Sequence, residues 1–122
     1  MAHKILRAHD GLLGYVPRPG VKGTMENGGP VTIDVDGSRV AGATPPSSNG
    51  LIASVGDSYT YGEDVGDREA WPAQLQTLSG KRVLNAGVSG YGFDQIVLRA
   101  ERIAETHQPS VIIVSFIAED IH

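Results

Sequence analysis

Ser58 is the residue of this sequence whose setting most clearly suggests covalent chemistry. It closes a Gly56-Asp57-Ser58 turn that directly follows the apolar run 51–55. A serine hydroxyl becomes a good nucleophile only when a base takes its proton, and acyl transfer also needs donors aimed at the developing oxyanion. A serine just past a strand end places its hydroxyl and its own N–H above the sheet. An ordinary strand-end serine fits the same tripeptide, so both interpretations stay open.

A second glycine-rich stretch, NAGVSGYG at 85–92, follows another short apolar segment. A glycine at position 90 would let a second backbone N–H approach the point that Ser58 faces, because no side chain blocks it. The alternative for Gly90 is a glycine at the entry to a helix. The spacing Gly-x-x-Gly-x-Gly differs from the Gly-x-Gly-x-x-Gly fingerprint of dinucleotide sites, so it does not indicate a nucleotide cofactor.

Alternating strand and helix patterns after residue 50 place these stretches in a fold. Apolar runs at 51–55, 82–88 and 110–117 predict strands, and the patterns at 70–80 and 93–107 predict helices. This order is typical of a parallel sheet with right-handed crossovers. Ligands collect at the carboxyl ends of such strands. We therefore expect the three turns that follow the strands to meet.

Both predicted helices carry an apolar stripe that should face the sheet. The stripe of the first comprises Trp71, Leu75 and Leu78. The stripe of the second comprises Ile96, Val97, Ala100, Ile103 and Ala104.

Residues 1–50 have a different texture, rich in Gly, Pro, Ser and Asn and without a helical period. The segment 31–40 alternates apolar and polar residues around Asp36-Gly37, which predicts a β-hairpin. The segment 42–50 is a linker by composition. The organisation expected is a loop and hairpin leader over 1–50, followed by an α/β domain over 51–122.

Composition limits the classes of function. A chain of 122 residues is read as one domain. Its net charge of −4 and the absence of a basic block argue against nucleic acid or an anionic membrane as partner. It has no cysteine, so thiolate metal sites are excluded. No apolar stretch is long enough to span a membrane, and the first residues do not form a signal peptide, so a cytoplasmic location is the default expectation.

Taken together, the three strand ends resemble the GDSL, or SGNH, hydrolase superfamily over about residues 51–122. GDSYTYG matches the first block of that family, NAGVSGYG is similar to the second, and the WPAQL helix start also looks like the family. The resemblance implies a three-layer, flavodoxin-like parallel sheet of about five strands. Only three strands are visible here, so the domain is expected to be truncated.

The resemblance also implies roles for individual residues. Ser58 would be the nucleophile, and the N–H groups of Ser58 and Gly90 would be oxyanion donors. Asp57 would brace the turn by accepting backbone hydrogen bonds. Glu119 stands where the third block has an asparagine that donates to the oxyanion, and an ionised carboxylate cannot donate.

A further departure concerns the base. The family's Asp-x-x-His lies downstream of its third block and has no counterpart in this sequence. The histidines are His3, His9, His107 and His122. The chain is therefore interpreted as the first part of a hydrolase domain: a shortened chain, a proteolytic fragment or a pseudoenzyme. The last strand would keep an open apolar edge. The 31–40 hairpin is one candidate to cover an edge of the sheet; otherwise this pattern predicts edge pairing or swapping between copies, or a missing segment that completes the sheet.

Two functions follow as expectations. The first is a serine ester hydrolase that acts on a small-molecule or carbohydrate ester through an acyl-serine, with no metal or organic cofactor implied. The second is a non-catalytic module of the same scaffold that binds carbohydrate or another protein. Glu119 and the absent base favour the second.

Overall fold

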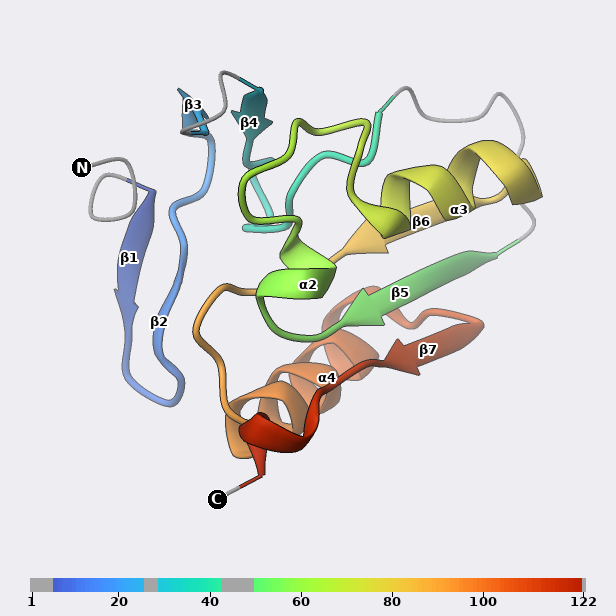
Figure 1. Ribbon diagram of the computed structural model, residues 1–122. Helices are drawn as coiled ribbons and strands as arrows, with labels where there is room; N and C mark the ends of the chain where they lie inside the picture. The colour runs from blue at the N-terminus through green and yellow to red at the C-terminus, as the bar shows by residue number, and fades with distance from the viewer. Residues whose placement is uncertain (1–5, 26–28, 43–49, 122) are drawn as a thin grey trace.

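The computed structural model describes residues 6–25, 29–42 and 50–121 (Figure 1). The predicted linker at 42–50 falls mostly outside these residues, as do His3 and His122. Within them no helix is both long and apolar enough to cross a bilayer.

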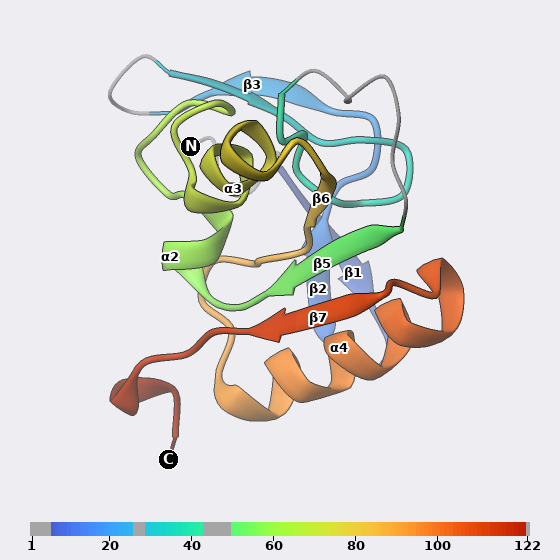
Figure 2. The same cartoon turned by 90° about the vertical axis from the view of Figure 1, so that its right-hand side faces the viewer.

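A three-stranded parallel sheet forms the centre of the fold, as the alternating pattern predicts. Its strands are β5 (Leu51–Val55), β6 (Arg82–Asn85) and β7 (Val111–Val114), in the order β6-β5-β7. Two helices connect them: α3 (Trp71–Ser79) packs on β6, and α4 (Phe93–His107) packs on β5 and β7 (Figure 2). The protein is therefore a mixed α/β fold whose central strand, β5, leads into the Gly56-Asp57-Ser58 turn.

The apolar stripe predicted for α3 is only partly right: Trp71 and Leu75 are half-buried. Leu78 is 85% exposed, and the buried face comprises Pro72, Ala73 and Gln76 instead. Gln76 is buried because its side chain binds the backbone on both sides: its Oε1 accepts from Val83 N at 2.9 Å, and its Nε2 donates to Ala41 O at 3.0 Å. A polar residue with satisfied hydrogen bonds therefore takes the place expected for a leucine.

The stripe predicted for α4 is only partly right. Ile96 and Ile103 are buried, whereas Val97 is exposed. Arg99 shares the buried face of the helix. Its guanidinium donates to Ala86 O at 2.7 Å and to Gly37 O at 3.3 Å, so these carbonyl groups compensate for its burial.

The described residues before 50 form two antiparallel strand pairs. The strands β1 (Arg7–Asp10) and β2 (Gly14–Pro17) pair with each other, as do β3 (Lys22–Thr24) and β4 (Pro30–Thr32). The sequence interpretation anticipates neither pair, although the first has a clear sequence signal. Asp10-Gly11 is the signal for it, because the Asp10 carboxylate accepts from the N–H groups of Leu12 and Leu13 and closes the turn.

The hairpin predicted at 31–40 is present as a tight turn rather than as two long arms. Asp34 N donates to Ser38 O at 2.8 Å, and a single bridge joins Ile33 to Arg39. Arg39 also forms an antiparallel bridge with Asn85 at the end of β6. The turn therefore covers part of one sheet edge, as one of the alternatives anticipates.

The opposite edge of the sheet is β7, which pairs only with β5 in the part of the chain that the structure describes. Val111 and Val114 on this strand are exposed. An edge of this kind favours pairing with another strand, and the edge-paired or swapped oligomer stays a prediction.

The β1–β2 pair and the parallel sheet share one hydrophobic cluster, whereas Val31 and Ile33 lie in a second cluster with Tyr61. Leu13 lies in the same buried cluster as Val55, Leu84 and Ile96. Two tyrosines add polar contacts across this boundary, because Tyr91 donates to Tyr15 O at 2.6 Å while Tyr15 donates to Ser89 O. Residues 6–42 are therefore an integral part of the packed unit.

Candidate functional site

The carboxyl ends of the three parallel strands meet, as the topology predicts. Val88 N, in the stretch after β6, donates to Gly56 O at 3.0 Å. Ser115 N, directly after β7, donates to Val55 O at 2.9 Å. The carboxyl group of Asp120, which follows the third strand, lies close enough to Asp57 to raise the pKa of Asp57. Segments from all three connections therefore surround the turn that carries Ser58.

Ser58 begins a single-turn helix, α2 (Ser58–Tyr61) (Figure 1). Asp57 is its N-cap, and its carboxylate accepts from Tyr59 N at 2.9 Å, which is the bracing contact expected of this residue. Gly62 ends the helix with a φ of +87°, a conformation that glycine adopts without strain. The sequence thus specifies a short helix between an aspartate cap and a glycine stop.

Ser58 is partly exposed and lines a surface hollow of about 440 Å³. Tyr59, Glu69 and Trp71 also line this hollow. The Ser58 hydroxyl forms no hydrogen bond with any residue that the structure describes. Ser58 is thus accessible to a small molecule, although no neighbouring group among these residues orients it.

Two glycines let the surrounding loops approach α2 closely. A Cβ atom at Gly56 would lie 2.2 Å from Thr60 Oγ1 and 2.8 Å from Ser115 O. A Cβ atom at Gly87 would lie 2.5 Å from Tyr61 N. Because real Cβ contacts are much longer than this, glycine is required at both positions. The sequence interpretation singles out Gly90 in this loop and does not single out Gly87.

Gly90 lies on the side of the loop that the early strands cover. Its φ is +85°, and a Cβ atom there would lie 2.5 Å from the Tyr15 hydroxyl. Within the described ranges, no hydrogen bond joins Gly90 or Glu119 to Ser58. The oxyanion roles of Ser58, Gly90 and Glu119 therefore stay predictions.

The segment after the third strand contributes Asp120 rather than Glu119 to the neighbourhood of Asp57. Both residues belong to the 3-10 turn η1 (Ala118–Asp120), in which Glu119 is exposed. Asp120 accepts from Ile117 N at 3.0 Å and adjoins Asp57. Asp120 directly follows Glu119, the residue that stands where the family has an asparagine. This position next to Glu119 is the sequence signal for Asp120.

Asp57 is buried and has an unusual electrostatic setting. Its Oδ1 atom caps α2, whereas its buried Oδ2 atom has no hydrogen-bond partner among the described residues. Burial raises the pKa of Asp57, and the nearby Asp120 carboxyl raises this pKa further, although the N–H of Tyr59 acts in the opposite direction. The pair of carboxyl groups therefore favours a proton close to Ser58.

Neither described histidine forms a hydrogen bond with Ser58. His107 ends α4, and its Nε2 atom lies 3.1 Å from Asp36 Oδ2. His9 is exposed on β1, where it pairs with Tyr15 of β2. The described ranges also hold no group of three or more histidine, cysteine or acidic side chains that could bind a metal.

Comparison with known proteins does not identify a family. No protein-family model matches the chain, and no curated protein matches it. The GDSL/SGNH resemblance therefore depends on the residues at the strand ends.

We expect Asp57→Asn to stabilise the protein at pH 7 by about 1 kcal/mol, because asparagine keeps the cap acceptor and its amide can donate to Asp120. A carboxyl group whose pKa rises on folding binds its proton more tightly in the native state. Wild-type stability is therefore lost as the pH rises through the raised pKa of Asp57. In urea unfolding, the stability gap between variant and wild type should widen from pH 4 to pH 7. A gap that does not change with pH would contradict the pairing. Glu101→Gln, at an exposed position on α4, is the control substitution of an acid by its amide.

Proposed function

We propose that residues 51–121 carry the nucleophile portion of a serine ester hydrolase of the GDSL/SGNH type, with Ser58 as the nucleophile. The observation that carries this proposal is the position of Ser58: partly exposed, beside a hollow, at the carboxyl end of the central parallel strand. In open parallel sheets this is where ligands bind.

The strand order gives the proposal further support. The order β6-β5-β7 corresponds to strands 2-1-3, which is how the flavodoxin-like order 2-1-3-4-5 begins. Right-handed crossovers in such a sheet place the two connecting helices on opposite faces, which gives three layers. The GDSYTYG and NAGVSGYG stretches follow the first and second strands of this arrangement, as in the family that they resemble.

In the reaction, the Ser58 oxygen attacks the carbonyl carbon of an ester, the alcohol leaves, and water then hydrolyses the acyl-serine. A base must accept the Ser58 proton and return it to the leaving alcohol; neither His9 nor His107 forms a hydrogen bond with Ser58 among the described residues. Backbone N–H groups of Ser58 and Gly90 are the proposed donors to the oxyanion. The substrate class is a small-molecule or carbohydrate ester.

The alternative is a non-catalytic module that uses the same hollow to bind carbohydrate or another protein. Two observations favour it: Glu119 stands in place of a donating asparagine, and Asp57 and Asp120 place acidic groups beside the Ser58 turn. Negative charge next to a developing oxyanion raises the barrier to acyl transfer.

Labelling with a serine-reactive fluorophosphonate should distinguish the two functions. We expect Ser58→Ala to lower labelling to background, because the hydroxyl of Ser58 is the proposed nucleophile. The matched control is Ser110→Ala, because Ser110 is exposed at the opposite end of the sheet and its variant should label like the wild type. Hydrolysis of p-nitrophenyl acetate should follow the same order. Equal labelling of the wild type and Ser58→Ala contradicts the proposal, and saturable carbohydrate binding by an unlabelled protein supports the module.

A further inference from the structure

The helix that carries Ser58 is too short to be stable by itself. It has four residues, and the first hydrogen-bonded turn of any helix costs more conformational entropy than one bond returns. Such a turn holds its shape only if other groups bind its free ends. Asp57 binds the amino end, as described above. The carbonyl groups at the carboxyl end need donors from elsewhere in the molecule.

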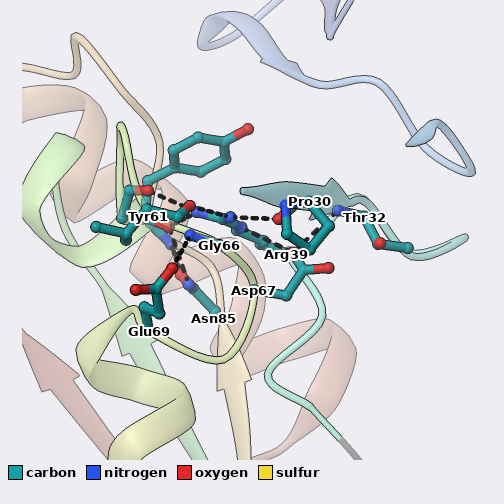
Figure 3. A network of polar contacts seen from close by, with 11 residues as sticks. Pro30, Thr32, Arg39, Tyr61, Gly66, Asp67, Glu69 and Asn85 are labelled. Carbon is teal, nitrogen blue, oxygen red and sulfur yellow. Dashed lines mark hydrogen bonds and ion pairs between the residues drawn. The ribbon is translucent and has the colours of Figure 1, made fainter. Parts of the chain in front are cut away.

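Arg39, from the early part of the chain, supplies the charged donors (Figure 3). Its Nη1 atom donates to Tyr61 O at 2.9 Å and to Gly62 O at 2.7 Å. Tyr61 is the last residue of α2, and Gly62 is the glycine that ends it. Two weaker neutral donors reach the same carbonyl groups: Asn85 Nδ2 donates to Tyr61 O at 3.3 Å, and Val65 N donates to Gly62 O at 3.2 Å. The guanidinium also lies 5.2 Å from the centre of the Tyr61 ring. One side chain from outside the parallel sheet thus binds both the backbone and the aromatic ring at the end of the helix.

The remaining donors of Arg39 fix the guanidinium itself. Nη2 donates to Val65 O at 2.6 Å and to Pro30 O at 3.1 Å, and Nε donates to Asp67 Oδ1 at 3.0 Å. The side chain is fully buried, and its backbone N–H donates to Asn85 O at 2.9 Å. A buried guanidinium with five hydrogen bonds has little freedom to move.

We infer that Arg39 is a positioning residue for Ser58: it holds the carboxyl end of α2 and thereby fixes where α2 presents the serine hydroxyl. This inference rests on the proposed role of Ser58 as nucleophile. The inference gives the described residues before 43 a function in the site, although they contribute no reacting atom.

Arg99 provides a matched comparison. It is also almost fully buried and also joins the early segment to the α/β unit, through Gly37 O and Ala86 O. Unlike Arg39, it donates no hydrogen bond to α2. Truncation of either arginine should lower stability, because each change removes charged donors from buried carbonyl groups. Only truncation of Arg39 should move Ser58.

The test measures two quantities in Arg39→Ala and Arg99→Ala: the second-order rate of Ser58 labelling by a fluorophosphonate, and amide hydrogen exchange across residues 59–62. We expect Arg39→Ala to label about 10- to 100-fold more slowly, as displaced catalytic groups do, and to exchange faster across α2. Ethylguanidinium should restore both towards wild-type values. Arg99→Ala should stay within about threefold of the wild type in labelling, with unchanged exchange across α2, after comparison at matched fraction folded.

A second variant, Arg39→Lys, is measured in parallel so that the inference is tested even if Arg39→Ala does not fold. Lysine keeps the charge but has no planar fork for these acceptors, so it should show the same defect in smaller degree. Equal labelling and exchange in the Arg39 and Arg99 variants would overturn the inference. If the wild type itself is not labelled, the proposed function has failed, and the exchange across α2 alone decides whether Arg39 holds this helix.

Discussion

Leu13→Ala is expected to lower the free energy of unfolding by about 2–5 kcal/mol, the range for deletion of a buried leucine side chain. Leu13 is only 2% exposed and lies in the same cluster as Val55 and Ile96 of the parallel-sheet unit. Removal of the Leu13 side chain would leave a cavity between the β1–β2 pair and the parallel sheet. Urea unfolding monitored by circular dichroism measures the effect on the whole fold.

The neighbouring residue provides the control. Leu12 is 58% exposed in the same turn, so Leu12→Ala should change the free energy of unfolding by less than about 0.5 kcal/mol. Equal effects of the two substitutions on the free energy of unfolding would mean that the β1–β2 pair does not pack on the parallel sheet. Unfolding of the Leu13 variant in two separate steps would show that the early segment is energetically independent of the α/β unit.

Gly87→Ala is expected to destabilise the protein by about 3 kcal/mol, the upper end of the range for an overpacked site. The added methyl group would lie 2.5 Å from Tyr61 N and 2.8 Å from Thr60 C, which are backbone atoms of α2. A backbone cannot rotate aside as a flexible side chain can, so either the loop or the helix must shift. The fluorescence of Trp71, the single tryptophan, should report this shift, because its Nε1 atom lies 3.3 Å from Thr60 Oγ1.

Gly11→Ala is the corresponding control, because a Cβ atom at Gly11 meets nothing within 4 Å. We expect it to be neutral or to stabilise by up to about 1 kcal/mol through a less flexible unfolded chain. Unchanged stability and unchanged Trp71 emission in Gly87→Ala would contradict the close contact between this loop and α2.

The helices and strands of the α/β unit follow from local patterns. The predicted strand at 51–55 and helix at 93–107 have the bounds that the structure shows. In both, the apolar pattern lies within the element and turn residues flank it. Residues close in sequence are therefore enough to predict the bounds of these two elements. The convergence of the three strand ends also follows from the sequence, because alternation of strands and helices restricts the topology.

The contacts of Arg39 show what local patterns do not contain. Arginine is rarely buried without partners, and no residue near it in sequence indicates the carbonyl groups of Tyr61 and Gly62. One clue is available in retrospect: Arg39 pairs directly with buried Ile33, so both side chains share one face of the turn. The exposure of Leu78 also depends on a distant segment. The backbone of β6 binds the Gln76 side chain, so Gln76 lies on the buried face of α3 and Leu78 points to solvent.

The sequence by itself determined the alternation of strands and helices after residue 50, the place of Ser58 just past the first of these strands, and Asp57 as the residue that braces its turn. Only the tertiary structure decided that the early segment shares the core, that Asp120 adjoins Asp57, and that Arg39 holds the end of α2. The physical reason is distance along the chain. Turn and helix preferences act between residues a few positions apart, whereas burial of a charge depends on carbonyl groups that folding brings together from distant segments.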